Sequence, residues 1–95
     1  MKKLTEQEIE ENIKDLQYWD LEEGMLVTSL DFKNFADAFA MMTRIAFEAE
    51  ANNHHPDWSN VYNNLTIRLT THDAGGLTDK DFYLARRIED IINGD

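Results

Sequence analysis

Hydrophobic residues recur at helical spacing in three separate segments of the chain. The first covers residues from about 5 to 15, where Thr5 followed by Glu8 is typical of a capping box. The longest runs from about 35 to 51, and the third follows Thr78. The predicted buried positions are Leu4, Ile9, Ile13 and Leu16 in the first segment, Phe35, Ala38, Phe39, Met42, Ile45, Ala46 and Ala49 in the second, and Phe82, Ala85, Ile88 and Ile92 in the third.

Four segments between these helices are rich in β-branched and aromatic residues and predict strands. The predicted strands span residues 18–22, 25–32, 57–62 and 65–71. The first two flank a turn at Glu23-Gly24, and the last two flank a predicted tight turn at Asn63-Asn64. Two hairpins separated by a helix predict an α+β fold in the order α-β-β-α-β-β-α. We expect a four-stranded antiparallel sheet with helices packed on one face.

Length and composition indicate one domain, which we expect to span residues 1–95. Apolar residues make up 42% of the chain, which favours a packed core. The 19 acidic and 9 basic residues give a formal charge of −10. Because a negative surface repels phosphate backbones, we expect no direct binding of nucleic acid.

Several other classes of protein are disfavoured by what the sequence lacks. No cysteine is present, so disulfides, thiolate metal ligands and thiol nucleophiles are excluded. The N-terminal residues lack the apolar run of a signal peptide, and no segment approaches the length of a membrane span. We therefore expect no membrane association and a cytoplasmic location.

The candidate chemistry lies in the stretch EANNHHPDW, residues 50–58, which contains two of the three histidines. His54 and His55 follow the predicted end of the long helix, and His72 follows the last predicted strand. Pro56 restricts His55 to an extended conformation and so holds its side chain more firmly than a free loop would. Strand alternation places His72 on the side of the sheet away from the buried leucines. The three imidazoles can therefore converge at one edge of the sheet.

Three interpretations of these histidines stay open at this point. A histidine in a loop is most often a solvated or hydrogen-bonded surface group. A zinc site is less well supported, because adjacent histidines in an extended segment point in opposite directions and no HExxH or CxxC pattern is present. Acid–base catalysis suits imidazole, which titrates near neutral pH, and typically contributes about 10²–10⁴-fold in rate.

Nearby acidic and aromatic residues allow two interpretations each. Asp81 stands three residues after Thr78, where it completes a helix cap, serves the histidines, or does both. Glu50 faces either solvent or the place where the histidines are expected to converge. Tryptophans such as Trp19 and Trp58 belong to a core or an interface more often than they stack on a ligand.

The segment EAEANNHHPDW, followed by NVYNNLTIRLTTHDAGGLTDKDFYLA, resembles the pterin-4a-carbinolamine dehydratases. The resemblance includes FKNFADAFAMMTRIAFEAE and the region of Trp19, and it covers the chain from about Leu4 to Ile92. It implies an α+β domain that forms dimers or tetramers. It also implies dehydration of 4a-hydroxytetrahydropterin, such as 4a-hydroxytetrahydrobiopterin, to quinonoid dihydropterin, without a metal or an organic cofactor.

The resemblance also assigns functional residues. The histidines of the family match His54, His55 and His72, and its acidic residue at the start of the last helix matches Asp81. We expect His54 and His72 to transfer protons, His55 to position the pterin, and Asp81 to orient or charge-stabilise a histidine. The expected substrate-binding residues are Glu50, Pro56, Trp19 and Lys80.

Lys80 departs from the family pattern, because many relatives carry arginine at this position. Lysine keeps the charge but lacks the planar fork of a guanidinium, which predicts a weaker grip on a polar part of the substrate.

A binding role without turnover is the alternative that the resemblance leaves open. The chain would then bind a pterin, or would join a protein partner such as an aromatic amino-acid hydroxylase or a transcription factor. Pterin turnover, measured against the spontaneous loss of water, separates these possibilities.

Overall fold

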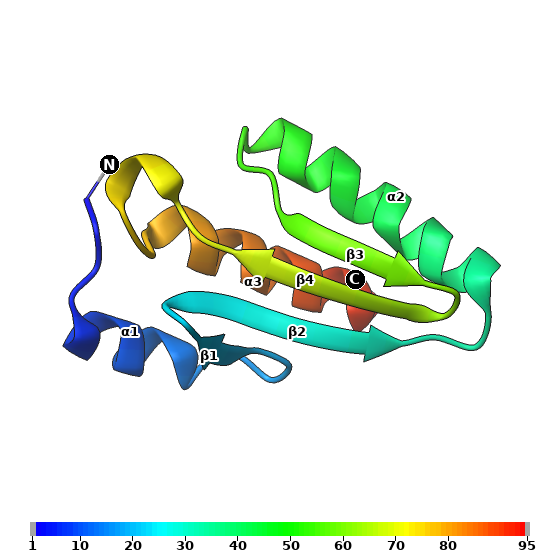
Figure 1. Cartoon of the computed structure of the whole chain (residues 1–95), viewed down its shortest axis with the longest axis horizontal. Helices are drawn as coiled ribbons and strands as arrows, with labels where there is room; N and C mark the ends of the chain where they lie inside the picture. The colour runs from blue at the N-terminus through cyan, green and yellow to red at the C-terminus, as the bar shows by residue number, and fades with distance from the viewer. Residues whose placement is uncertain (1, 95) are drawn as a thin grey trace.

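The computed structural model of the chain describes residues 2–94, which form three α-helices and one four-stranded sheet (Figure 1). The elements in chain order are α1 (Glu6–Ile13), β1 (Asp20–Glu22), β2 (Met25–Asp31), α2 (Phe35–Ala51), β3 (Asp57–Val61), β4 (Asn64–Leu69), the 3₁₀ turn η1 (His72–Ala74) and α3 (Asp79–Ile92). The strand order is β1-β2-β4-β3, and every neighbouring pair is antiparallel. The predicted fold class is confirmed. The prediction of one domain includes Met1 and Asp95, which lie outside the described residues.

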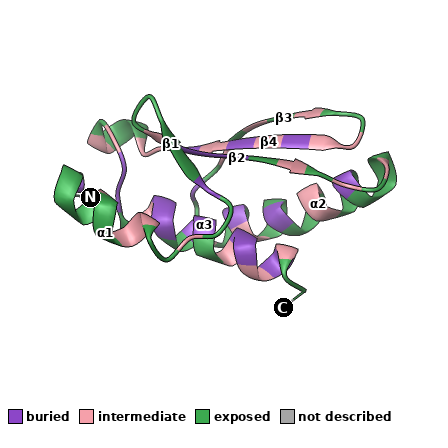
Figure 2. Cartoon of the chain, turned by 90° about the horizontal axis from the view of Figure 1, so that it is seen from below, coloured by how far each residue is buried: buried purple, intermediate pink, exposed green. Residues whose placement is uncertain are grey.

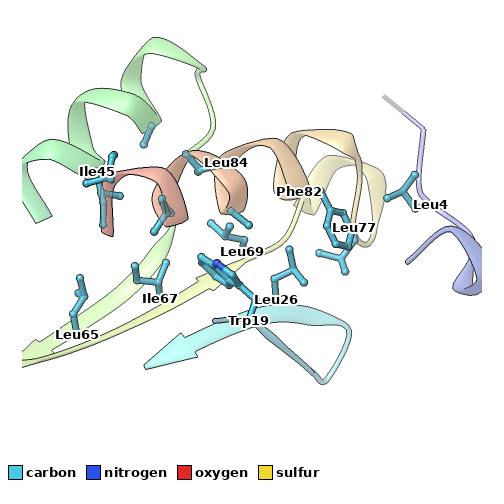
Figure 3. Close-up of a cluster of buried hydrophobic side chains, with 14 residues drawn as sticks. Leu4, Trp19, Leu26, Ile45, Leu65, Ile67, Leu69, Leu77, Phe82 and Leu84 are labelled. Carbon is cyan, nitrogen blue, oxygen red and sulfur yellow. The ribbon is translucent and has the colours of Figure 1, made fainter. Parts of the chain in front are cut away.

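All three helices cover the same face of the sheet, and the buried residues gather between the two layers (Figure 2). β4 and α3 supply the centre of this core (Figure 3). Leu65, Ile67 and Leu69 of β4 are at most 1% exposed, and so are Phe82 and Ile88 of α3. Because side chains alternate across a strand, the three β4 residues all face the helices. Each such burial stabilises the fold by about 1.5–3 kcal/mol.

The helix starts confirm the caps predicted at Thr5 and Thr78. Thr5 and Glu8 form a reciprocal capping box at α1, and Thr78 and Asp81 form another at α3. Asn34 accepts a hydrogen bond at the start of α2. α2 has the predicted bounds, whereas α1 is shorter than the predicted 5–15.

The prediction that Phe35, Phe39 and Met42 lie in the core of this chain is wrong for the two phenylalanines. Phe35 is 47% exposed and Phe39 is 55% exposed, while Met42 is partly buried against the core. Ala46 is also exposed. The reason is that α2 flanks the sheet and packs through a narrower stripe of side chains than its apolar pattern indicated. That fully buried stripe consists of Ala38, Ile45 and Ala49.

A buried carboxylate shortens β1 relative to the predicted strand at 18–22. Glu89 of α3 is 7% exposed and accepts hydrogen bonds from the backbone N–H groups of Gln17, at 2.7 Å, and Tyr18, at 2.9 Å. The backbone N–H of Tyr18 therefore bonds to Glu89 of α3, and β1 begins at Asp20. The same contact anchors the segment that carries Trp19 into the core.

The turn of the second hairpin lies at Tyr62-Asn63, one residue before the predicted position. Asn63 shifts the turn by binding the end of β2: its side chain donates to the Phe32 carbonyl and its own carbonyl accepts from the Phe32 N–H, both at 2.8 Å. Asn64 belongs to β4, opposite Val61. Tyr62 consequently adopts φ 52°, a left-handed conformation that costs about 1–2 kcal/mol.

An ion pair joins the exposed sides of α2 and α3. Nε of Arg87 donates to Oε1 of Glu48 at 3.0 Å, and Nη1 donates to Asp90 at 2.9 Å. The hydrogen bond from Arg87 holds the pKa of Glu48 below its usual value. Among residues 2–94, no helix is both long enough and apolar enough to cross a membrane.

We predict that Glu89→Ala destabilises the fold. The substitution leaves the amides of Gln17 and Tyr18 without their acceptor, which lowers the free energy of unfolding by about 2–4 kcal/mol. Urea denaturation measures the change. Arg86→Ala, on the exposed side of the same helix, is the matched control and changes stability by less than about 0.5 kcal/mol. Equal stability of the two variants would contradict the anchoring role of Glu89.

Candidate functional site

The C-terminal end of α2 sets the position of the histidine pair. Asn53 adopts φ 49°, as expected for an asparagine at a helix end. The N–H of Asn53 bonds to the carbonyl of Glu50, and the N–H of His54 bonds to the carbonyl of Ala49, which together form a Schellman motif. The chain then turns towards β3, with Pro56 following the pair. Two backbone hydrogen bonds thus fix where His54 and His55 leave the helix.

The two adjacent histidines face opposite environments, as predicted for an extended segment. His54 is 9% exposed, and its Nε2 lies 2.5 Å from Oδ1 of Asp81. His55 is exposed, and its Nε2 lies 2.8 Å from Oε1 of Glu50. His54 therefore points into the fold, whereas His55 lies at the surface.

Asp81 is fully buried and is the partner that holds His54. Its Oδ2 accepts hydrogen bonds from the backbone N–H of Thr78 at 2.9 Å and from the hydroxyl of Thr71 at 2.7 Å. Oδ1 contacts His54. The same carboxylate thus completes the cap of α3 and also contacts a histidine.

His72 reaches the site from the 3₁₀ turn η1. β4 ends at Leu69, two residues before the predicted end, and Thr71 then forms an isolated bridge with Gly76. His72 therefore does not owe its direction to strand alternation. Nevertheless it lies with Arg68 and Thr70 around one small cavity, on the side that the sequence indicated. Its side chain is exposed and makes no hydrogen bond within residues 2–94.

The three imidazoles meet at a polar cavity of about 340 Å³, which confirms their predicted convergence. This volume is at the lower end of the range of about 300–1,000 Å³ that is usual for small-molecule sites. The lining residues are Asn53, His54, His55, Thr70, Thr71, His72, Asp73 and Lys80. The cavity lies where the end of α2, the end of β4 and the start of α3 come together.

The predicted substrate-binding residues are distributed over three places. Lys80 lines the histidine cavity. Glu50 and Pro56 line a larger apolar cavity of about 480 Å³ that shares His55 with it. Trp19 lies in the hydrophobic core at 5% exposure and is not among the residues that line either cavity (Figure 3).

The histidine cavity is suited to proton transfer. It contains one imidazole held by a buried carboxylate and a second that is free to meet a ligand, so a proton donor and a proton acceptor can line the same cavity. The larger apolar cavity has only His55 and Glu50 as titratable side chains. Within residues 2–94, no group of three histidine, aspartate or glutamate side chains is placed to hold a metal ion.

Thr71 is a member of the site that the sequence patterns did not indicate. Its hydroxyl lies 2.7 Å from Asp81 and 2.8 Å from the hydroxyl of Thr78. The sequence does contain a signal, because a threonine directly precedes His72 and another caps α3. Their meeting depends on the bridge between Thr71 and Gly76, which closes the loop between them and which residue spacing alone does not predict.

Comparisons with known proteins agree on one family. The model of the family described as pterin 4 alpha carbinolamine dehydratase matches residues 2–91. A relative from Christiangramia forsetii is 55% identical over 97% of this chain and 95% of its own. A relative from Solibacter usitatus is 49% identical over 97% of both chains. Both carry pterin-4-alpha-carbinolamine dehydratase as a provisional name.

A solved structure shares the fold closely. The crystal structure of a protein from Brucella melitensis, described as a transcriptional coactivator/pterin dehydratase, superposes with a TM-score of 0.90 at 36% identity. The match covers 94% of this chain and 97% of that one.

We predict that Asp81→Asn destabilises the fold far more than Asp79→Asn. An amide accepts only at its oxygen, so in this fully buried place it cannot replace both carboxylate oxygens, each of which has a hydrogen-bond partner. The free energy of unfolding falls by about 2–4 kcal/mol. Asp79 is exposed in the same helical turn, and its replacement changes stability by less than about 0.5 kcal/mol. Denaturant titration of both variants measures the difference, and equal losses would refute the special role of Asp81.

Proposed function

Because this chain belongs to the pterin 4 alpha carbinolamine dehydratase family, we propose that it dehydrates 4a-hydroxytetrahydropterin to quinonoid dihydropterin by histidine acid–base catalysis. The observation that carries the proposal is the cavity at which His54, His55 and His72 meet. The reaction makes the chain a hydro-lyase. It returns the product of an aromatic amino-acid hydroxylase, such as 4a-hydroxytetrahydrobiopterin, towards reuse, and we place it in the cytoplasm.

The chemistry needs one proton donor and one proton acceptor. The substrate carries a hydroxyl on C4a, next to the N5–H group. A base removes the proton from N5, the electron pair forms the C4a=N5 bond, and the C4a–O bond breaks while an acid protonates the leaving hydroxyl. Water is the second product, so the two proton transfers balance and no redox partner is needed. General acid–base help of this kind contributes about 10²–10⁴-fold.

The proposed roles of the histidines follow from their different surroundings. His54 and His72 transfer the protons, since both line the cavity and belong to separate segments of the chain. Asp81 orients the imidazole of His54 through the contact at 2.5 Å. His55 positions the pterin, and its bond to Glu50 restrains the ring. Lys80 offers a positive charge to the polar part of the substrate at the same cavity.

We also propose that the chain forms a homo-oligomer, a dimer or a tetramer. The exposed apolar surface of α2 supports this, because Phe35, Phe39 and Phe47 would otherwise present three aromatic rings to water. Phe35 and Phe39 have ring centroids 5.8 Å apart and so form one continuous patch. β3 adds an open sheet edge beside Val61 and Tyr62, which are also exposed.

Stopped-flow absorbance with freshly generated 4a-hydroxytetrahydropterin tests the activity. We expect the wild type to accelerate loss of water well above the buffer rate. His72→Ala lowers kcat at least about tenfold, because an acid–base group is lost, and it leaves stability unchanged since His72 is exposed. Lys33→Ala, in the connection between β2 and α2 and outside the lining of the histidine cavity, retains the wild-type rate.

Two results would count against the proposal. A wild-type trace equal to buffer would replace the enzyme with a pterin-binding or protein-partner module. A His72→Ala rate equal to the wild-type rate would remove His72 from the proton transfers. Isothermal titration with a stable pterin then distinguishes a binding protein from one that has no affinity for the ring system.

Sedimentation equilibrium tests the oligomer. We expect the wild type to sediment as a dimer or a tetramer, and Phe39→Asp to shift the population towards a smaller species, since the patch around Phe39 then carries a charge. Gln7→Asp, on the exposed surface of α1, is the control for one added negative charge and leaves the sedimenting mass unchanged. A wild type that stays monomeric at high micromolar concentration would exclude this assembly.

A further inference from the structure

The hydrogen bonds around Asp81 have directions that can be assigned by counting hydrogens. The backbone N–H of Thr78 can only donate, so Oδ2 of Asp81 accepts it. The hydroxyl of Thr71 has one hydrogen and donates it to the same oxygen. In the contact between the two hydroxyls, at 2.8 Å, Thr78 is therefore the donor and Thr71 the acceptor. The Thr78 oxygen accepts in turn from the N–H of Lys80.

These hydrogen bonds end on Oδ2 of Asp81, so Oδ1 is the oxygen that contacts His54. Oδ2 already accepts two hydrogens, and Oδ1 lies 2.5 Å from Nε2 of the imidazole. Each of the three contacts is one that an ionised carboxylate accepts. An ionised Asp81 can only accept, so with that carboxylate Nε2 of His54 is the nitrogen that carries a hydrogen, and in the neutral ring the lone pair is on Nδ1.

Nδ1 of His54 is also the ring nitrogen with access to the outside. It has no hydrogen-bond partner within residues 2–94. Among those residues, Nε1 of Trp19 is the one side-chain polar atom that is both buried and without a partner. Nδ1 thus keeps some exposure, and His54 lines the cavity that it shares with His55 and His72.

We propose that Thr71 is a positioning residue that fixes His54 in its Nε2–H tautomer, so that Nδ1 is the atom that exchanges protons with the ligand. The hydroxyl of Thr71 holds the carboxylate of Asp81 in the one rotation that presents Oδ1 to His54. Without that hydroxyl, Oδ2 keeps only the amide of Thr78, and the broad torsion of an aspartate carboxylate lets the group rotate. The effect of this role on catalysis rests on the proposed function. The tautomer itself can be observed without turnover.

The test uses the full chain labelled with ¹⁵N at histidine. Long-range ¹H–¹⁵N spectra, at a pH where the ring of His54 is neutral, report which nitrogen carries the hydrogen. We expect a single Nε2–H form in the wild type and in Thr71→Ser, which keeps the hydroxyl. Thr71→Val is nearly isosteric and removes it, so we expect averaging between the two tautomers. Thr66→Val makes the same change on β4 outside the cavity and keeps the wild-type pattern.

Steady-state measurements of kcat and KM separate a positioning role of Thr71 from a role in substrate binding. Thr71→Val lowers kcat roughly tenfold with KM within about twofold, and Thr71→Ser stays within about twofold in both. Melting temperatures of the three variants confirm that each is folded.

Each outcome decides one of the two proposals. A wild-type His54 with its hydrogen on Nδ1, as a protonated Asp81 would impose, overturns the positioning role whatever the activity. Retention of the single Nε2–H form in Thr71→Val overturns it as well. The expected tautomers without any turnover would leave the positioning role standing and remove the dehydratase function instead.

Discussion

The carboxylate of Asp81 is the contact on which the arrangement of the site depends. It lies at the third residue of α3, fully buried, and it binds the cap of its own helix, a hydroxyl beyond the end of β4 and an imidazole beyond the end of α2. A charge removed from water is tolerated only where hydrogen bonds replace its hydration. The hydrogen bonds that the buried carboxylate of Asp81 requires therefore join the three segments. The histidine cavity lies beside them.

The one-sided fold explains why these segments meet. All helices pack on one face of an antiparallel sheet, so successive elements run back and forth along the same axis. α2 ends, β3 begins, β4 ends and α3 begins at the same end of the molecule (Figure 1). The β3–β4 turn and the connection from β2 to α2 lie at the opposite end. Chain direction alone thus places His54 and His72 near each other, and side-chain contacts then fix their orientation.

The sequence predicted those parts that follow from local chemistry. The caps at Thr5 and Thr78 depend on residues three positions apart, and each is present. The convergence of the histidines followed from element order.

What the sequence could not predict depends on contacts between distant residues. The late start of β1 results from Glu89, which is 71 positions away from Tyr18 along the chain. Asn63 moves a turn by binding Phe32 across 31 positions. The exposure of Phe35 and Phe39 depends on how much of the surface of α2 the neighbouring elements cover. An apolar pattern gives only the largest helix surface that could be buried. Thr71 belongs to the site through a loop closure that no local pattern signals.

The position of Asp81 after both histidine segments has a consequence for synthesis. The ribosome releases α3 after α2 and β4, so a nascent chain contains both histidine segments before their carboxylate partner has emerged. Until then Leu65, Ile67 and Leu69 have no helix α3 to cover them, and an uncovered apolar sheet face is prone to associate with other chains. A chain that terminates before residue 79 therefore lacks the carboxylate that holds His54 and leaves this apolar sheet face uncovered.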